Sequence, residues 1–298
     1  MQKIIHLISS INRGGAEKQM INLINNDQNR QHYIVTLIKS HELKQDLKNQ
    51  NVEIYTLNIN RSLISKILIP FRLYSIIKKI NANIIFCWMY HSCLISSYLK
   101  LIKKIKIYWL IRHGSPYLPF VSFKNLLLNY LLSFLSFFIP EKIIYNSNYS
   151  LINHNKFGFN KKNSYLIYNG YDPRNYIINS QIKLQFKNKN KISQNYFLIG
   201  FLARYHKIKN HELLFSSLKI LVEKYPNFKF KLLLAGKDIN YKNYNLIEDL
   251  KKNLIFNHTF LFDKIENSSD FFNKIDLQVS PSINESFPNV ISESLLCG

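Results

Sequence analysis

Residues 3–9 of the chain are KIIHLIS, and residues 106–112 are KIYWLIR. Both runs are continuously apolar rather than alternating, which is typical of parallel strands buried on both faces. Similar runs recur up to residue 170, with helical patterns between them: YIVTLI (33–38), VEIYTLN (52–58), NIIFCWM (83–89), KIIYNS (142–147) and SYLIYNG (164–170). This alternation predicts an α/β domain with a parallel sheet over residues 1–170.

A second series of strands begins at residue 196. Its members are YFLIGFLAR (196–204), FKFKLLLAG (228–236), NHTFLF (257–262) and DLQVSPS (276–282). Residues 171–195, between the two series, are polar and have no clear period, so we expect an interdomain linker there and a second domain over 196–298. The predicted fold class is therefore α/β, with two Rossmann-like domains in tandem. The second domain is expected to be incomplete, because it has only four strands.

The composition excludes several classes of protein. With 47% hydrophobic residues the chain is not a disordered tail, and its three cysteines include no CxxC pair that would indicate a zinc site. Lys and Arg number 40 against 18 acidic residues, a net charge of +22. This charge indicates either a solvated lysine surface or an anionic partner such as a nucleotide or a membrane. Nucleic acid is not expected, because the cations are scattered and no basic-aromatic motif occurs.

The most apolar stretch is LLLNYLLSFLSFFI, residues 126–139, which is too short to span a bilayer. We expect a buried helix there, with a helix lying in the plane of a membrane as the alternative. Basic and apolar stretches at 61–79 and 99–109 fit a peripheral membrane site or, equally, ordinary helices between strands. No signal peptide opens the chain, so we expect a cytoplasmic protein, with peripheral association at the inner face of the cell membrane as an option.

Two pairs of residues follow predicted strands, where open α/β sheets bind their ligands. Gly14 and Gly15 precede a helix, so a ligand could approach the backbone closely there; a simple turn is the alternative. Their spacing is not that of the dinucleotide-binding fingerprint. Arg204 and Lys209 follow the first strand of the second series. They could clamp phosphate oxygens or be two solvated cations.

The segment SPSINESFPNVISESLLCG, residues 280–298, is the most informative. Pro288 suits the first turn of a helix, which places Glu285 in the loop before that helix and Glu293 inside it. Carboxylates accept hydrogen bonds from hydroxyl groups, such as those of a sugar or a ribose. Two glutamates without a ligand are the alternative.

The start of the same helix is a candidate phosphate site. Backbone amides near Phe287, Asn289 and Val290 would surround the positive end of the helix. Such an end can hold a diphosphate. Together with the two glutamates, this arrangement suggests a sugar, a diphosphate and a ribose bound in line.

In combination these motifs resemble the retaining glycosyltransferases of family 4, which have the two-domain fold called GT-B. The similarity covers essentially the whole chain in order. The matching motifs are GGAE (14–17), IRHG (111–114), NGYD (169–172), Arg204 with Lys209, and Glu285 with Glu293. One departure is Ser286, where family members usually have glycine, which could narrow the space near the sugar.

The resemblance implies a reaction and a set of site residues. A sugar would pass, with retained configuration, from a nucleotide-sugar such as a UDP-sugar to a hydroxyl group; the nucleotide-sugar is a substrate, and no cofactor is expected. Glu285 and His113 would contact the transferred sugar as the catalytic pair, although His113 could instead be an ordinary loop histidine. Glu293 would contact the ribose, while Arg204 and Lys209 would stabilise the departing diphosphate. No DxD triplet occurs, so no metal is expected.

The resemblance also suggests an acceptor. The C-terminal segment is similar to that of enzymes extending lipid-linked oligosaccharides for bacterial surface polysaccharides, such as O-antigen, lipopolysaccharide or capsule. The expected partners are thus a nucleotide-sugar and a glycan or lipid-linked oligosaccharide, with an anionic membrane surface as a further option. Family members continue beyond the point where this chain stops, so we expect a truncated enzyme. The alternatives are a non-enzymatic anion- or membrane-binding protein and a sugar-nucleotide epimerase of the same fold.

Overall fold

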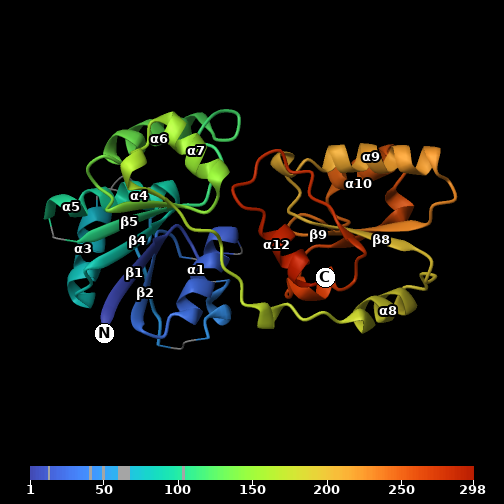
Figure 1. Ribbon diagram of the computed structural model, residues 1–298, viewed down its shortest axis with the longest axis horizontal. Helices are drawn as coiled ribbons and strands as arrows, with labels where there is room; N and C mark the ends of the chain where they lie inside the picture. The colour runs from blue at the N-terminus through green and yellow to red at the C-terminus, as the bar shows by residue number, and fades with distance from the viewer. Residues whose placement is uncertain (13, 40–41, 49–50, 60–67, 103–104) are drawn as a thin grey trace. The chain divides into compact units, whose positions relative to one another are not determined.

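The computed structural model describes the chain apart from residues 13, 40–41, 49–50, 60–67 and 103–104 (Figure 1). Two compact units are present, residues 1–170 and residues 171–298. Each unit is a twisted parallel sheet with helices packed on it. The predicted α/β class with two Rossmann-like units is confirmed.

The first unit contains a sheet of seven described strands in the order β3-β2-β1-β4-β5-β6-β7, with every neighbouring pair parallel. The strands are β1 Gln2–Ile8, β2 Arg30–Thr36, β3 Glu53–Thr56, β4 Ile84–Trp88, β5 Lys106–Ile111, β6 Lys142–Tyr145 and β7 Ser164–Leu166. The helices are α1 Gly15–Asn26, α3 Ile69–Ile80, α4 Met89–Ser97, α5 Leu99–Ile102, α6 Phe123–Leu135 and α7 Asn148–Phe157. Each strand overlaps one of the seven predicted runs, although β2 begins three residues before its run.

The apolar runs of the central strands are explained by helices on both faces of this sheet. In β1, Ile5 and Leu7 pack in one hydrophobic cluster, whereas Ile8 packs in another. Trp88 and Trp109 are fully buried, one in each cluster. A strand covered on both faces needs apolar residues at successive positions, and this is why the runs do not alternate.

The second unit contains four described strands in the order β10-β9-β8-β11, all parallel. They are β8 Phe197–Leu202, β9 Phe230–Ala235, β10 Thr259–Phe262 and β11 Leu277–Gln278. The helices are α8 Ser180–Lys189, α9 His211–Lys224, α10 Tyr244–Lys252, α11 Ser268–Phe272 and α12 Asn289–Leu296. Helix α9, between β8 and β9, buries Leu214, Phe215 and Leu218.

Much of the expected linker, residues 171–195, folds as part of the second unit. Within it, α8 places Phe186 in the same buried cluster as Leu198. The Lys187 ammonium group is buried and donates to the carbonyl oxygens of Gln194 and Tyr196, at 2.9 and 2.8 Å. This helix was missed because few of its residues are apolar, so its period in the sequence is weak.

The prediction of a buried helix over residues 126–139 is wrong. Helix α6 covers Phe123–Leu135 and packs against α4, but only Asn129 and Leu132 are buried along it. Leu and Phe occur all round this helix, so the sequence does not show which face is covered. Among the described residues, no helix has the length and apolar character needed to cross a bilayer.

Gly236 allows the loops after β8 and β9 to approach each other. Its φ of +135° is unfavourable for other residues, and a Cβ atom there would lie 2.5 Å from the carbonyl oxygen of Ala203. The Gly236 amide also donates to the Phe262 carbonyl at 2.9 Å. The backbone leading into Arg204 is therefore packed directly on this glycine.

We predict that Gly236→Ala lowers the free energy of unfolding by about 2 kcal/mol or more, through strain at positive φ and a clash with backbone. Urea unfolding followed by circular dichroism would measure it. The matched control is Gly170→Ala, because a Cβ atom at Gly170 meets nothing within 4 Å. Equal unfolding midpoints for the two variants would contradict the prediction.

Candidate functional site

The carboxyl end of β8 carries the first cationic residues of the site. Arg204 lies just beyond the strand and is exposed, and a short 3-10 helix, η4 Lys207–Lys209, follows. His206 begins that turn by accepting from the Ile208 amide at 3.3 Å. Burial lowers the pKa of His206 first, and the nearby charges of Arg204 and Lys209 lower it further. The strand end is thus a region of positive potential.

Lys209 and Glu285 are in direct contact, although 76 residues separate them. The Lys209 ammonium group donates to Glu285 Oε1, and both side chains are about three-quarters buried. The two loops are also joined through the backbone, because the Ile283 amide donates to the Ile208 carbonyl at 2.9 Å. The structure therefore brings together two residues that the sequence predicted from separate motifs.

The loop before α12 contains buried oxygen atoms without a partner. Among the described residues, neither Ser282 Oγ nor Asn284 Oδ1 has a hydrogen-bond partner, although both atoms are buried. Buried polar atoms are nearly always satisfied, by protein, by water or by a ligand. These two positions were not singled out in the sequence, where Ser and Asn are common loop residues.

The helix of the glutamate motif begins at Asn289, and Pro288 is the residue just before it. The prediction had placed Pro288 inside the first turn, a difference of one residue. Phe287 stacks on the Tyr171 ring, with centroids 6.5 Å apart, and Asn289 Oδ1 accepts from the Tyr171 hydroxyl at 2.6 Å. Val290 packs against the adjacent hydrophobic cluster. The start of α12 is therefore held by a tyrosine from the expected linker.

Glu293 lies in the second turn of α12 and is only 3% exposed. Its carboxylate is hydrogen-bonded to Tyr176, whose pKa is raised first by burial and then by the charge of Glu293. The predicted contact of Glu293 with a ribose stays a prediction. Tyr171 and Tyr176 were missed. They belong to a polar segment with no regular spacing of apolar residues, and nothing in such a segment indicates that its tyrosines contact α12.

The first unit holds the glycine pair at the start of α1. Gly14 is the residue before the helix, and a Cβ atom there would lie 2.2 Å from Glu17 Oε2. Gly14 therefore leaves room for the Glu17 carboxylate. Glu17 lies in the first turn of α1, where the positive end of the helix dipole stabilises its negative charge. Burial raises the pKa of Glu17. A role of Gly14 and Gly15 in donor binding stays a prediction.

His113 follows β5, and its ring contacts a backbone carbonyl oxygen. Its Nδ1 lies 2.9 Å from the Ser115 carbonyl oxygen, which can only accept, so Nδ1 carries the proton and Nε2 keeps its lone pair. Burial lowers the pKa of His113, and the Ser115 contact partly opposes this. The neutral ring thus presents a hydrogen-bond acceptor.

Behind His113 lies a buried polar network. Ser150 Oγ donates to the His113 carbonyl at 2.6 Å, and His154 Nδ1 donates to the Ser150 carbonyl at 2.7 Å. The Tyr90 hydroxyl donates to His154 Nε2 at 2.7 Å. This chain of contacts ties His113 to α4 and α7, and it was not evident from the sequence.

Arg112, next to His113, is another residue that sequence reasoning missed. Its guanidinium group lies 5.1 Å from the centre of the Trp88 ring and donates to Asn169 Oδ1 at 2.7 Å. Burial lowers the pKa of Arg112 to about 10. Asn169 belongs to the NGYD motif, so the contact joins the end of β5 to that motif.

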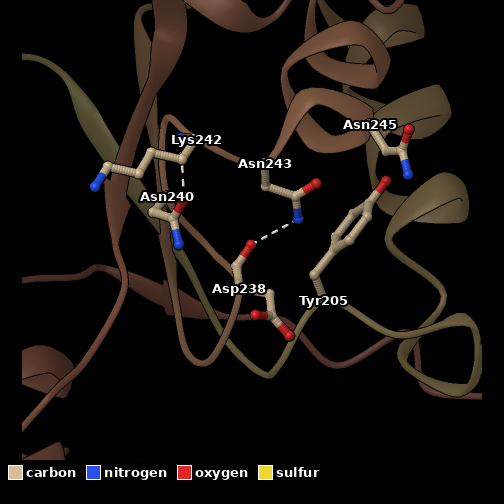
Figure 2. A pocket seen from close by; sticks show the side chains of 6 residues that line it. All are labelled: Tyr205, Asp238, Asn240, Lys242, Asn243 and Asn245. Atoms are coloured by element: carbon tan, nitrogen blue, oxygen red, sulfur yellow. Dashed lines mark hydrogen bonds between the residues drawn. The ribbon is translucent and has the colours of Figure 1, made fainter.

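An open hollow of about 380 Å³ lies after β8 and β9 in the second unit (Figure 2). Its lining residues are Tyr205, Asp238, Asn240, Lys242, Asn243 and Asn245. Asn243 donates to the Asp238 carbonyl at 2.8 Å, and the Lys242 amide donates to Asn240 Oδ1 at 3.0 Å (Figure 2). The contacts drawn there stabilise the loop itself, and none of the predicted site residues lines this hollow.

Two family models match the chain. The model described as Glycosyltransferase Family 4 matches residues 13–175, more than half of the chain, and the model described as Glycosyl transferases group 1 matches residues 182–298. The chain belongs to glycosyltransferase family 4. The predicted resemblance is therefore confirmed at the level of the family.

Similar proteins agree with this membership. EpsF of Bacillus subtilis strain 168, a candidate glycosyltransferase, is 30% identical over 134 residues, which is 45% of this chain and 34% of EpsF. The match thus spans about a third of that relative. The crystal structure of Anabaena HepE with UDP and glucose has a TM-score of 0.83 and 18% identity, covering 100% of this chain and 79% of HepE. Sucrose-phosphate synthase of Thermosynechococcus elongatus has a TM-score of 0.80 and 12% identity, covering 100% and 80%.

At these identities the structural matches show the fold alone, which is GT-B. The family 4 chain thus has the predicted architecture. In its second unit the predicted residues Lys209 and Glu285 meet, and Phe287 and Asn289 share Tyr171 as a neighbour. Gly14, Gly15 and His113 belong to the first unit.

We predict that the first unit loses stability as the pH falls below about 6.5. Burial lowers the pKa of His154 to about 3 in the folded chain, whereas the unfolded histidine takes up a proton near its usual value of 6.5. Between these values the unfolded state binds more protons, so acid favours unfolding by up to about 1.4 kcal/mol per pH unit.

Tryptophan fluorescence during urea unfolding would report this, because the chain's two tryptophans, Trp88 and Trp109, both lie in the first unit. His154→Gln should reduce the slope of stability against pH between pH 6.5 and 4.5. The exposed His91 offers a matched control in His91→Gln, which should leave the slope unchanged. An unchanged slope in His154→Gln would show that His154 does not cause the acid sensitivity.

Proposed function

We propose that this chain transfers a sugar from a nucleoside-diphosphate sugar to a hydroxyl group, with retention of the anomeric configuration. The observation that carries the proposal is the contact between Lys209 and Glu285 beside the start of α12. A cation for phosphate and a carboxylate for sugar hydroxyls are then adjacent at the carboxyl end of a parallel sheet. Family membership supports the same reaction class.

The diphosphate would be bound by positive groups of the second unit. Arg204 can donate to two phosphate oxygens at once, and Lys209 adds a compact charge. The amides at the start of α12 supply further donors, supported by the helix dipole. These groups would stabilise the charge that develops as the nucleoside diphosphate leaves, and the proposal invokes no metal ion.

The bond changes are balanced within the substrates. The bond from the anomeric carbon to the diphosphate oxygen breaks, and a bond to the acceptor oxygen forms on the same face of the sugar. The acceptor's proton passes to the departing diphosphate. Glu285 would orient the sugar by accepting from its hydroxyl groups, and Glu293 would accept from the ribose. His113 is assigned to the transferred sugar, with Nε2 accepting from a hydroxyl group.

The acceptor is proposed to be a glycan, carried on a lipid, in the synthesis of a bacterial surface polysaccharide. The resemblance of residues 280–298 to enzymes of that group supports this assignment. A structural match named lipopolysaccharide outer core galactosyltransferase WaaB is consistent with it, with a TM-score of 0.66 and 13% identity over 99% of this chain and 78% of that one. The reaction would take place in the cytoplasm, at the inner face of the cell membrane.

The diphosphate assignment predicts a specific loss of affinity. Arg204→Ala should weaken binding of UDP by about 1.5–3 kcal/mol, or roughly 10- to 150-fold, because a charged hydrogen bond is lost. Isothermal titration calorimetry would measure it. Lys207→Ala removes an exposed cation from the same turn and should change affinity little. Equal effects of the two substitutions would indicate a general charge effect instead of a clamp.

If Glu285 binds the transferred sugar, substituting it should affect UDP binding and sugar transfer differently. Glu285→Gln removes the negative charge beside Lys209, so UDP should bind as well as before or more tightly. Transfer of the sugar should fall by about 100-fold or more, because hydrogen bonds to the reacting sugar are lost. Calorimetry with UDP and a product assay in the presence of chelator would test both. Normal turnover by Glu285→Gln would overturn the assignment, and loss of wild-type turnover in chelator would overturn the metal-free reaction.

A further inference from the structure

Helix α6 and the turn after it present a large apolar face to solvent. Seven large side chains there are each 46–65% exposed: Phe123, Leu127, Tyr130, Leu131, Phe134, Phe137 and Phe138. Their spacing of three or four residues places them along one side of the helix. Single exposed apolar residues are common on proteins, whereas a continuous row of this length marks an interaction surface. We call this surface the α6 face.

The α6 face continues onto α7. The Tyr130 ring lies 4.6 Å from that of Phe157, and the two helices lie side by side (Figure 1). Farther along α7, Tyr149 and Ile152 are also about half exposed. The α6 face therefore borders α7, a helix that also exposes apolar side chains.

Lysines flank the α6 face at both ends. Lys124 is exposed near its beginning. At the other end, the Asn160 amide donates to Ser136 Oγ at 2.9 Å, which places the exposed Lys161 and Lys162 next to the end of α6. Exposed Lys156 directly precedes Phe157.

Acidic residues are nearly absent from this part of the chain. From Ile54 to Tyr171 the sequence contains fifteen Lys and Arg and one acidic residue, Glu141. Glu141 is itself paired with Lys100 at 2.7 Å. A surface that is apolar at its centre and mainly cationic at its edges matches a bilayer with anionic headgroups.

We propose that the α6 face docks on the surface of an anionic lipid bilayer. Helix α6, about 20 Å long, would lie in the plane of the membrane. Its Phe and Leu side chains would enter the acyl boundary, and the flanking lysines would contact lipid phosphates. A second copy of the chain fits less well, because the same lysines would then face one another.

The α6 face lies on the stretch 126–139, for which the sequence offered a helix in the plane of a membrane as the alternative, and not on the two basic stretches. Of the stretch 61–79, residues 61–67 lie outside the described part, and helix α3 exposes Phe71 among polar and basic side chains. Residues 103–104 of the stretch 99–109 likewise lie outside it. Helix α3 therefore has the ordinary solvated face of a crossover helix.

Flotation with vesicles tests the proposal without any sugar donor, so its outcome is independent of the proposed transfer reaction. The purified chain should bind vesicles of phosphatidylglycerol and phosphatidylethanolamine, more weakly at high salt, and bind phosphatidylcholine vesicles poorly. The double variant Leu127→Ser with Phe134→Ser should reduce the partition coefficient at least about tenfold. The control is the double variant Phe71→Ser with Ile220→Ser. These two side chains are 69% and 50% exposed on other helices, so the control should bind vesicles like wild type.

A fluorescent reporter gives a second measurement. Both native tryptophans are fully buried, so Phe134→Trp would add the one tryptophan exposed on this surface. Its emission should shift to the blue with anionic vesicles and be quenched by brominated lipid, whereas Phe71→Trp should show neither change. Equal vesicle binding by the double variant and wild type, or no quenching at position 134, would overturn the proposal. The proposal would also be overturned if the wild-type chain were a dimer, the double variant were a monomer, and neither bound vesicles.

Discussion

The central position of β8 in the second sheet determines where the candidate donor site forms. Strand β8 pairs with β9 on one side and β11 on the other, all parallel, so the loops after β8 and β11 leave the sheet at the same edge. This is how Lys209 and Glu285 come into contact across 76 residues. The close backbone packing at Gly236 then fixes the path of the chain into Arg204.

Tyrosines from the start of the second unit contact α12 and the loop before it. Tyr171 contacts Phe287 and Asn289, and Tyr176 hydrogen-bonds to the buried Glu293. The segment that follows the first unit is therefore bonded to the helix that we expect to bind the diphosphate. A change in the path of this segment would act on α12 directly, through two side chains.

The first unit combines a well-buried sheet with an exposed apolar surface. Its sheet is buried on both faces. The Ser115 carbonyl holds the His113 ring in one tautomer, and the Tyr90–His154–Ser150 network is bonded to the His113 backbone carbonyl. Its outer α6 face leaves apolar side chains in solvent, and such exposure is unfavourable unless something covers it. This exposed face is the surface that we propose to dock on a lipid bilayer.

The sequence alone determined the strands, because a parallel strand buried on both faces is apolar over a short local run, as KIIHLIS is in β1. The sequence also identified the motifs by their positions along the chain. Arg204 follows a predicted strand, and Glu285 precedes a predicted helix. Only the tertiary structure decided that α6 is exposed and that Tyr176 lies against Glu293. The physical reason is that burial of an apolar helix face, and the partner of a buried carboxylate, depend on which distant segments pack there, and no local pattern contains that information.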